Sequence, residues 1–580
     1  RRATGDGRRA TGDGRRATGD GRRATGDGRR ATGDKRILLA ARSAVALHRL
    51  LDTLPVFTGD HRITRLFTLV PGSDFDVDAL SAIDAMGGRT VPWDEACEEE
   101  FDLILSASPK GELRALKGKR ILLPHGAGFN KSIQGEGTAD SASGLDPAYL
   151  LPNPEAEGVT LHALAHPDQV SRLAAMSPSA AERARVVGDP TLDRLLESWP
   201  LRDGYREALG TGPRHLVVMA STWGPESLLR RWPELPRELA AQLPCDEYQL
   251  ALIVHPNEWA LLGTYNLSEH LEPALEAGLI LAAPYEEWAS VLIAGDSLVT
   301  DHGSSALYYA ATRDRPVVTS HRDYDELIPG TPMDHLLNDA PLLKSASALH
   351  EVLGSYAAGG GRRAAQAAFA CPGEGLSHLR TEAYGLLGLE PPSLPVRPRA
   401  LPSPTLGRTP AAFDVHAELL IDGVRITRKP AFLGPPGHHL AVEHGVAGER
   451  PSRSAGLLCK RAATDEATRR EASWTAGGWM GHVFAEYPNC RVASVILSRE
   501  ECLVRLRDLE NPYAVRVAAW SDGERVVHAD PMAASSAAYA WLVAHPEPLR
   551  DLTPVECLIG CHTFRMTIGP AAADALSHKV

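Results

Sequence analysis

Short apolar runs alternate with amphipathic stretches over the first part of the chain. From residue 36 to about 134, four mainly apolar runs predict strands, and the stretches between them predict helices. Because continuous apolar strands are typical of parallel sheets covered on both faces, this series predicts a doubly wound α/β unit. The strands are predicted at Arg36–Ala40, Arg65–Val70, Asp102–Leu105 and Arg120–Leu123, and the helices at Ser43–Leu54 and Asp76–Met86.

A second series with the same pattern runs from about residue 214 to 320. Two such series predict two Rossmann-like lobes, which we place at residues 36–200 and 201–390. Ligands of these folds bind beyond the carboxyl ends of the strands, so we expect the two lobes to share a ligand-binding cleft. The second-lobe strands are predicted at His215–Ala220, Gln249–Val254, Leu279–Ala282 and Ser297–Thr300, with helices at Glu226–Leu243, Tyr285–Ile293 and Ser304–Ala311.

The remaining segments do not follow this pattern. Residues 1–35 are five tandem copies of a basic heptad, RRATGDG, in which one alanine per repeat cannot form a coiled-coil seam, so we expect disorder. Six prolines between residues 391 and 404 predict a semi-rigid linker over 391–407. Residues 408–580 contain strand-like runs and a hairpin signal at Ser521–Glu524, which predict an α+β domain without an assigned function.

Composition excludes several classes of protein. The net charge of -12 argues against a sequence-independent nucleic-acid binder. We find no apolar run of about 18 residues that predicts a membrane span, and the first residues lack the apolar stretch of a secretion signal. Eight scattered cysteines are typical of reduced thiols. No G-x-x-x-x-G-K-[ST] loop is present, which argues against a GTPase. We therefore expect a cytoplasmic protein, which could still lie at the inner face of a membrane.

Two histidines directly follow predicted strands, one in each lobe. His125 is followed by small residues and then by Lys131, and an imidazole that titrates near neutrality can take a proton from a hydroxyl. His255 stands before Pro256 and could donate a hydrogen bond to a phosphate or a leaving group. A histidine at such a position can also simply bond the backbone, but one in each lobe favours a shared site.

A serine-tipped helix supplies candidate phosphate ligands. Asp301, Gly303, Ser304 and Ser305 join a predicted strand to a predicted helix. Free N–H groups and the helix dipole at such a terminus bind phosphate, although a serine cap without a ligand fits the pattern equally well.

Three weaker signals complete the sequence evidence. Ser221 and Thr222 follow the first strand of the second lobe and could contact a nucleotide, while Gly188 lies in a turn before a helix; each pattern is also typical of an ordinary turn or cap. The segment Cys557–His562 holds two cysteines and a histidine, but no fourth ligand is obvious, so packing is favoured over zinc.

In this order, the segments resemble the motif series of the CDP-glycerol glycerophosphotransferases, the teichoic-acid primases and polymerases. That resemblance implies a GT-B fold and spans about residues 110–330. The matching positions are His125-Gly126 with Lys131, Gly188-Asp189-Pro190 with Asp193, Ser221-Thr222, His255-Pro256, and Asp301 to Ser305.

The resemblance also implies a reaction. A hydroxyl acceptor, in this family a lipid-linked one, attacks the β-phosphorus of a CDP-activated donor such as CDP-glycerol and releases CMP. His125 is then the candidate base, His255 and the Ser304–Ser305 pair hold the donor pyrophosphate, and Lys131 offsets charge. No metal or cofactor besides the nucleotide-activated donor is expected.

The sequence departs from the family pattern at three places. Thr191 and Trp223-Gly224 stand where the family often has arginine, and His302-Gly303 stands where it has tyrosine. Fewer cations imply a weaker hold on a diphosphate. Two alternatives therefore stay open: a nucleotide-sugar glycosyltransferase or UDP-sugar 2-epimerase, and a nucleotide-binding scaffold without catalysis.

Overall fold

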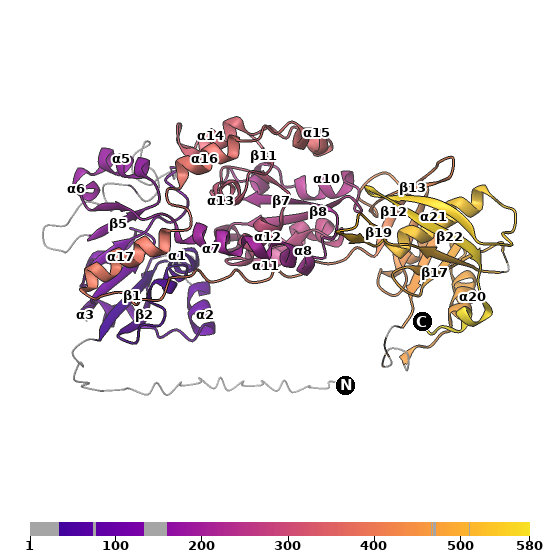
Figure 1. Cartoon of the computed structure of the whole chain (residues 1–580), viewed down its shortest axis with the longest axis horizontal. Coiled ribbons are helices and arrows are strands. Elements are labelled where there is room, and N and C mark those ends of the chain that lie inside the picture. Colours follow the sequence, from indigo (N-terminus) through magenta and orange to yellow (C-terminus); the bar gives the residue numbers. More distant parts are fainter. Residues whose placement is uncertain are drawn as a thin grey trace, which may run out of the picture.

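The computed structural model describes residues 34–72, 77–132, 145, 159–463, 465, 467, 471–509 and 511–580. They form two α/β lobes followed by a C-terminal barrel domain (Figure 1). The predicted repeat lies outside the described residues except for its last two positions. Lys35 opens the first strand, where it pairs with Ile63 and its Nζ lies 3.0 Å from Asp102 Oδ1, so the predicted end of the repeat is corrected to residue 34.

The first lobe is a six-stranded parallel sheet in the order β2-β1-β3-β4-β5-β6. Its four predicted strands are present, and two more follow them. Ile37, Leu38 and Leu39 are all fully buried, which explains why the strand reads as a continuous apolar run. The elements are β1 (Lys35–Ala41), α1 (Ala44–Leu51), β2 (Ile63–Leu69), α2 (Val77–Ala85), α3 (Trp93–Glu98), β3 (Leu103–Ser106), β4 (Arg120–Leu122), β5 (Leu161–Leu164), α5 (Pro167–Met176), α6 (Pro178–Ala181) and β6 (Ala184–Val186).

The second lobe is a five-stranded parallel sheet in the order β11-β10-β7-β8-β9. Together the two lobes confirm the predicted GT-B arrangement of Rossmann-like halves. The elements are α7 (Pro190–Ser198), α8 (Arg202–Ala208), β7 (His215–Ser221), α9 (Leu228–Arg231), α10 (Leu235–Gln242), β8 (Tyr248–Val254), α11 (Pro256–Glu276), β9 (Ile280–Leu281), α12 (Glu287–Ala294), β10 (Ser297–Thr300), α13 (Ser305–Thr312), β11 (Val317–Thr319), α14 (Pro332–Asp339), α15 (Leu349–Gly354) and α16 (Gly360–Ala368).

One predicted helix of this lobe is wrong in extent. The stretch Glu226–Leu243 forms two helices, α9 and α10, rather than one. Pro233 follows Trp232, which adopts a non-helical conformation at the end of α9. Proline lacks an N–H and disfavours helical geometry in the residue before it, so the helix ends there.

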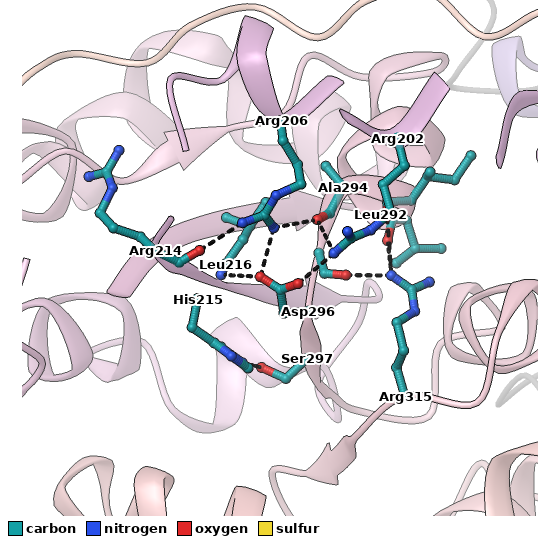
Figure 2. Close-up of polar contacts among 12 residues, drawn as sticks. Arg202, Arg206, Arg214, His215, Leu216, Leu292, Ala294, Asp296, Ser297 and Arg315 are labelled. Carbon is teal, nitrogen blue, oxygen red and sulfur yellow. Dashed lines mark hydrogen bonds and ion pairs between the residues drawn. The ribbon is translucent and has the colours of Figure 1, made fainter. Parts of the chain in front are cut away.

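An ionic cluster lies in the second lobe at the edge of the sheet opposite the carboxyl ends of the strands (Figure 2). Asp296 accepts hydrogen bonds from Arg202, Arg206 and the N–H of Leu216, at 2.5, 2.7 and 2.8 Å. Burial alone would raise the pKa of Asp296, but the Leu216 N–H and the Arg206 charge hold it below its usual value. Arg315 donates to carbonyls at the end of α12, where the helix dipole favours a cation.

The chain crosses between the lobes twice, which corrects the predicted division at residues 200 and 390. Leu192 and Leu195 of α7 are buried in the core of the second lobe. Helix α17 (Gly375–Leu387) returns to the first lobe, where it packs in the core with Ile37 and Leu39 (Figure 1). Helix α7 therefore follows the first crossing, and helix α17 follows the second.

The C-terminal α+β domain is a closed sheet in the order β12-β13-β21-β22-β18-β17-β16-β15-β14. Helix α21 contributes buried alanines and serines to the same core as the strands. The elements are β12 (Ala412–Leu419), β13 (Gly423–Pro430), β14 (His439–Glu443), α18 (Glu449–Ser454), β15 (Leu457–Arg461), α20 (Ala476–Glu486), β16 (Val492–Ile496), β17 (Glu501–Leu506), β18 (Tyr513–Val517), β19 (Trp520–Ser521), β20 (Val526–Val527), α21 (Pro531–Ala544), β21 (Thr553–Ile559) and β22 (His562–Pro570).

The barrel domain docks on the second lobe, at the end away from the first lobe (Figure 1). Arg428 is 3% exposed, and its guanidinium lies 2.6 Å from Asp246 of the lobe and 2.8 Å from Asp530 of the barrel. The preceding proline-rich segment is not a loose tether, because Leu401 is buried and its N–H donates to Ser198 Oγ at 2.9 Å. Among the described residues, no helix combines the length and the apolar character that a membrane span needs.

Candidate functional site

A cavity of about 420 Å³ lies between the lobes, beyond the carboxyl ends of β4, β7, β8 and β10. This is the edge at which ligands of doubly wound sheets bind. Of the ten predicted site residues, the cavity brings together eight and leaves Asp301 and Gly188 outside its lining. The eight are His125, Lys131, Ser221, Thr222, His255, Gly303, Ser304 and Ser305.

The lobes approach one another closely at this cavity. A Cβ atom on Gly126 of the first lobe would lie 3.2 Å from Ser304 Oγ of the second, so the two lobes are nearly in contact here. Beside this contact, the N–H of Ile328 donates to the carbonyl of Asn130 at 2.9 Å. The serine-tipped helix start and the His125 loop thus lie on facing walls of one site.

Hydrogen bonding fixes the tautomer of His255. His255 Nδ1 accepts the N–H of Asn257 at 3.1 Å, so in the neutral ring the proton is on Nε2, which is left as a donor. For His125, the backbone of Ala107 acts to raise the pKa, but by less than desolvation lowers it.

Both imidazoles line the cavity and are neutral at physiological pH. His125 is an exposed residue in the cavity lining, whereas His255 is half-buried. Desolvation by the cavity walls, followed by the charges of Lys110 and Arg49, lowers the pKa of His125 to about 4. Burial, followed by the influence of His125 and Lys131, lowers the pKa of His255 to about 3. A neutral His125 can accept a proton, but its pKa lies below the near-neutral value expected from the sequence, which makes the free ring a weaker base.

These pKa values predict how stability depends on pH. An unfolded histidine has a pKa of about 6.5. Below this pH the unfolded chain therefore binds protons at His125 and His255 that the folded chain does not bind. The free energy of unfolding should therefore fall as the pH drops from about 6.5 toward the folded values, and be unaffected by these groups above that window. Denaturation of His125→Gln and His255→Gln across pH 4–8 should each give a shallower slope than the wild type; equal slopes would contradict the shifts.

Asp301 holds the site together from beneath rather than facing a ligand. It is fully buried, and its carboxylate accepts the N–H groups of Thr222, Leu228 and Gly303 at 2.8, 2.7 and 2.9 Å. These bonds join the loop after β7 to the loop after β10. The predicted phosphate contact of Asp301 is therefore corrected to a positioning role, because a buried carboxylate that fixes two loops is not available to an anion.

Lys131 spans the cleft in a network that the sequence did not reveal. Its Nζ lies 3.4 Å from Glu326 Oε2 and 4.9 Å from the centre of the Trp223 ring. His302 Nε2 lies 3.2 Å from the same Glu326 oxygen. Burial would raise the pKa of Glu326, but His302 and Lys131 hold it below its usual value. Glu226, His302 and Glu326 also form a group in which a metal ion could bind.

Sequence reasoning missed an arginine at the centre of the lobe junction. Arg49 of α1 lines the cavity and is 6% exposed. Its guanidinium donates to Asp189 at 2.5 and 2.8 Å and to Tyr308 Oη at 3.0 Å, and its Nε donates to the carbonyl of Pro124, next to His125. Arg49 therefore places a cation at the cavity wall that is already paired with Asp189.

Gly188 lies at the crossing between the lobes rather than in the cavity, which corrects its predicted contact with the donor. Its φ is +93°, and a Cβ would lie 3.1 Å from Gly375 Cα. The glycine therefore allows the turn before α7 to pack against the start of α17. A sequence pattern of glycine before aspartate and proline cannot distinguish this close approach from a ligand contact.

The predicted zinc alternative at the barrel is not supported by the geometry. Cys557 is buried in the barrel core, whereas Cys561 is exposed in the turn between β21 and β22. Among the described residues, neither cysteine belongs to a group whose ligand atoms lie close enough to share a metal ion.

Comparison with known proteins gives similar structures at low identity. No protein-family model matches the chain, and no curated protein matches it. A solved structure of the wall teichoic acid polymerase TagF is 14% identical with a TM-score of 0.43, and covers 61% of this chain and 89% of that one. Anabaena Alr3699/HepE in complex with UDP and glucose is 13% identical with a TM-score of 0.37, covering 61% and 100%.

A third similar structure is S. aureus MnaA with UDP, 9% identical with a TM-score of 0.39, covering 63% of this chain and 100% of that one. At such identities and scores, no residue role passes from these proteins to this chain. The fold assignment rests on the two parallel sheets and the two crossings described above.

Proposed function

We propose that this protein is a transferase that moves glycerol phosphate, or a related group, from a CDP-activated donor to a hydroxyl acceptor. The observation that carries the proposal is that one imidazole from each lobe, His125 and His255, lines the same inter-lobe cavity beside a serine-tipped helix start. The ordered motif series of the sequence supplies the donor class.

In the proposed reaction, a ring nitrogen of His125 takes the proton of the attacking hydroxyl. The oxygen then bonds to the β-phosphorus of the donor, and the bond to the bridging oxygen breaks to release CMP. His255 Nε2–H donates to the donor phosphate, and the N–H groups at the start of α13 stabilise the charge that develops there. Arg49 and Lys131 line the cavity walls, where they are paired with Asp189 and Glu326. Positioning and electrostatics supply the rate enhancement.

A thermal-shift panel tests the donor. A ligand that binds the folded state at one hundred times its Kd stabilises it by about 2.7 kcal/mol. We expect CDP-glycerol and CDP to raise the Tm more than CMP, and UDP-sugars and GTP to leave it unchanged. A rise with UDP-sugars alone would replace the proposal with a nucleotide-sugar enzyme of the same fold.

The acceptor is tested separately. In the proposed function it is a hydroxyl of a cell-envelope polymer, such as a lipid-linked glycerol phosphate at the inner face of a membrane. Incubation of the full chain with CDP-glycerol and such an acceptor should release CMP and lengthen the acceptor. Ligand binding without either product would favour a nucleotide-binding scaffold.

A further inference from the structure

Three metal-ligating side chains come together outside the cleft, where the chain returns from the second lobe to the first. Cys371, Glu374 and His378 lie on the turn before α17 and on its first turn. One ligand atom from each lies within 4.8 Å of the other two, and His378 Nε2 is 3.7 Å from Glu374 Oε2. Cysteine, carboxylate and imidazole are together the ligands that zinc accepts.

The orientation of His378 is the one that metal-binding histidines adopt. Its Nδ1 lies 3.3 Å from the carbonyl of Val187, and since a carbonyl can only accept, Nδ1 must carry the proton. The lone pair is then on Nε2, which faces Glu374. A ring N–H anchored on a backbone carbonyl is the usual outer-shell contact of a metal-bound histidine, because it fixes the ring and its tautomer.

The turn that carries Cys371 is held firmly in place. Asp193 of α7 accepts the N–H groups of Gly373 and Leu376 at 2.9 and 2.8 Å. The N–H of the neighbouring Ala370 donates to the carbonyl of Ala165 in the first lobe at 2.7 Å. These bonds fix the turn before any ion binds, so little ordering remains to oppose binding.

Two details show that the side chains of Cys371 and Glu374 do not stabilise the local backbone. Cys371 has a φ of +52°, a conformation in which glycine is favoured and a side chain costs free energy. Glu374 stands at the N-cap of α17, yet its side chain makes no cap hydrogen bond. Both are accounted for if the thiol and the carboxylate act as ligands.

We propose that Cys371, Glu374 and His378 bind one divalent ion of the zinc class, with the fourth position open to water or a small ligand. The ion would link the turn that carries Cys371 to the first turn of α17, beside the Gly188 crossing. It lies outside the cavity proposed for catalysis and does not depend on that function.

Cobalt substitution tests the site in the full-length protein. The chain is stripped with a chelator under reducing conditions and titrated with Co²⁺ alone, which gives a charge-transfer absorption when a thiolate binds it. We expect one Co²⁺ per chain with such a band, and displacement of the band by Zn²⁺. Cys371→Ser should abolish the band, and His378→Gln should weaken Co²⁺ binding by at least about tenfold.

Cys561→Ser is the matched control, because Cys561 is the exposed free thiol of the barrel domain. It should keep the band and the affinity of the wild type. Circular dichroism identifies any variant that fails to fold, and His378→Gln, whose ring is half-exposed, tests the site even if Cys371→Ser does not fold. The proposal is wrong if the wild type gives no thiolate band, or if the band survives in Cys371→Ser or His378→Gln with unchanged affinity.

Discussion

Replacement of His125 by alanine should lower kcat by about 10²–10⁴-fold, the contribution of a positioned general base. The affinity for the donor should change little, because the proposed donor contacts come from His255 and the start of α13 in the other lobe. Release of CMP from CDP-glycerol measures kcat, and calorimetric titration with a non-reacting nucleotide measures binding.

The controls use the different roles proposed for the two imidazoles. Because His255 is proposed to act as a hydrogen-bond donor, His255→Gln, whose amide N–H can donate, should retain more activity than His255→Ala. Glutamine at position 125 cannot act as a base and should be as inactive as alanine. His270→Ala, at an exposed position of α11, should behave as the wild type.

Equal activity of His125→Ala and the wild type, with binding retained, would refute catalysis by this residue. That outcome would favour the scaffold interpretation. A loss of binding together with activity would instead place His125 among the donor contacts and remove its role as a base.

The fold was predictable where strands are buried on both faces and run parallel to their neighbours. A central parallel strand such as β1 is covered on both faces, so its apolar run appears directly in the sequence. The candidate site was predictable for the same reason. His125 and His255 each follow such a strand, and parallel strands deliver their carboxyl ends to one edge.

Contacts between distant segments could not be predicted in this way. The closure of the barrel depends on pairing between β13 and β21 and between β12 and β14, which no local pattern encodes. Asp301 shows the same limit within the site. Its position after β10 correctly placed it near the helix start, but only the packing of the loop after β7 turns its carboxylate inward.

The cations of the junction illustrate the point most clearly. The motif series predicted a poor supply of positive charge, because it compared aligned positions only. Arg49 comes from a helix of the first lobe that carries none of the compared motifs. The linear pattern could therefore not show this cation, nor its pairing with Asp189.

Replacement of Arg49 by methionine should lower the free energy of unfolding by about 3–5 kcal/mol, the usual cost of breaking a buried ion pair. The loss arises because Asp189 stays buried without its charged partner. Asp189 is 2% exposed and would keep a charge with the hydroxyl of Tyr308 as its remaining side-chain donor. Chemical denaturation of the full chain, followed by circular dichroism, measures the loss.

A double-mutant cycle separates this effect from lost packing. Asp189→Asn keeps an oxygen for the Leu192 N–H at the start of α7 but removes the charge. The double variant Arg49→Met with Asp189→Asn should therefore be less destabilised than the sum of the single variants, by about 0.5–3 kcal/mol. Arg237→Ala, which breaks an exposed pair with Glu234, should cost less than about 1 kcal/mol. Strict additivity in the cycle would mean that the pair contributes only as packed volume. In that case the charge of Arg49 would not be what holds α1, α7 and α13 together beside the carbonyl of Pro124, the residue before His125.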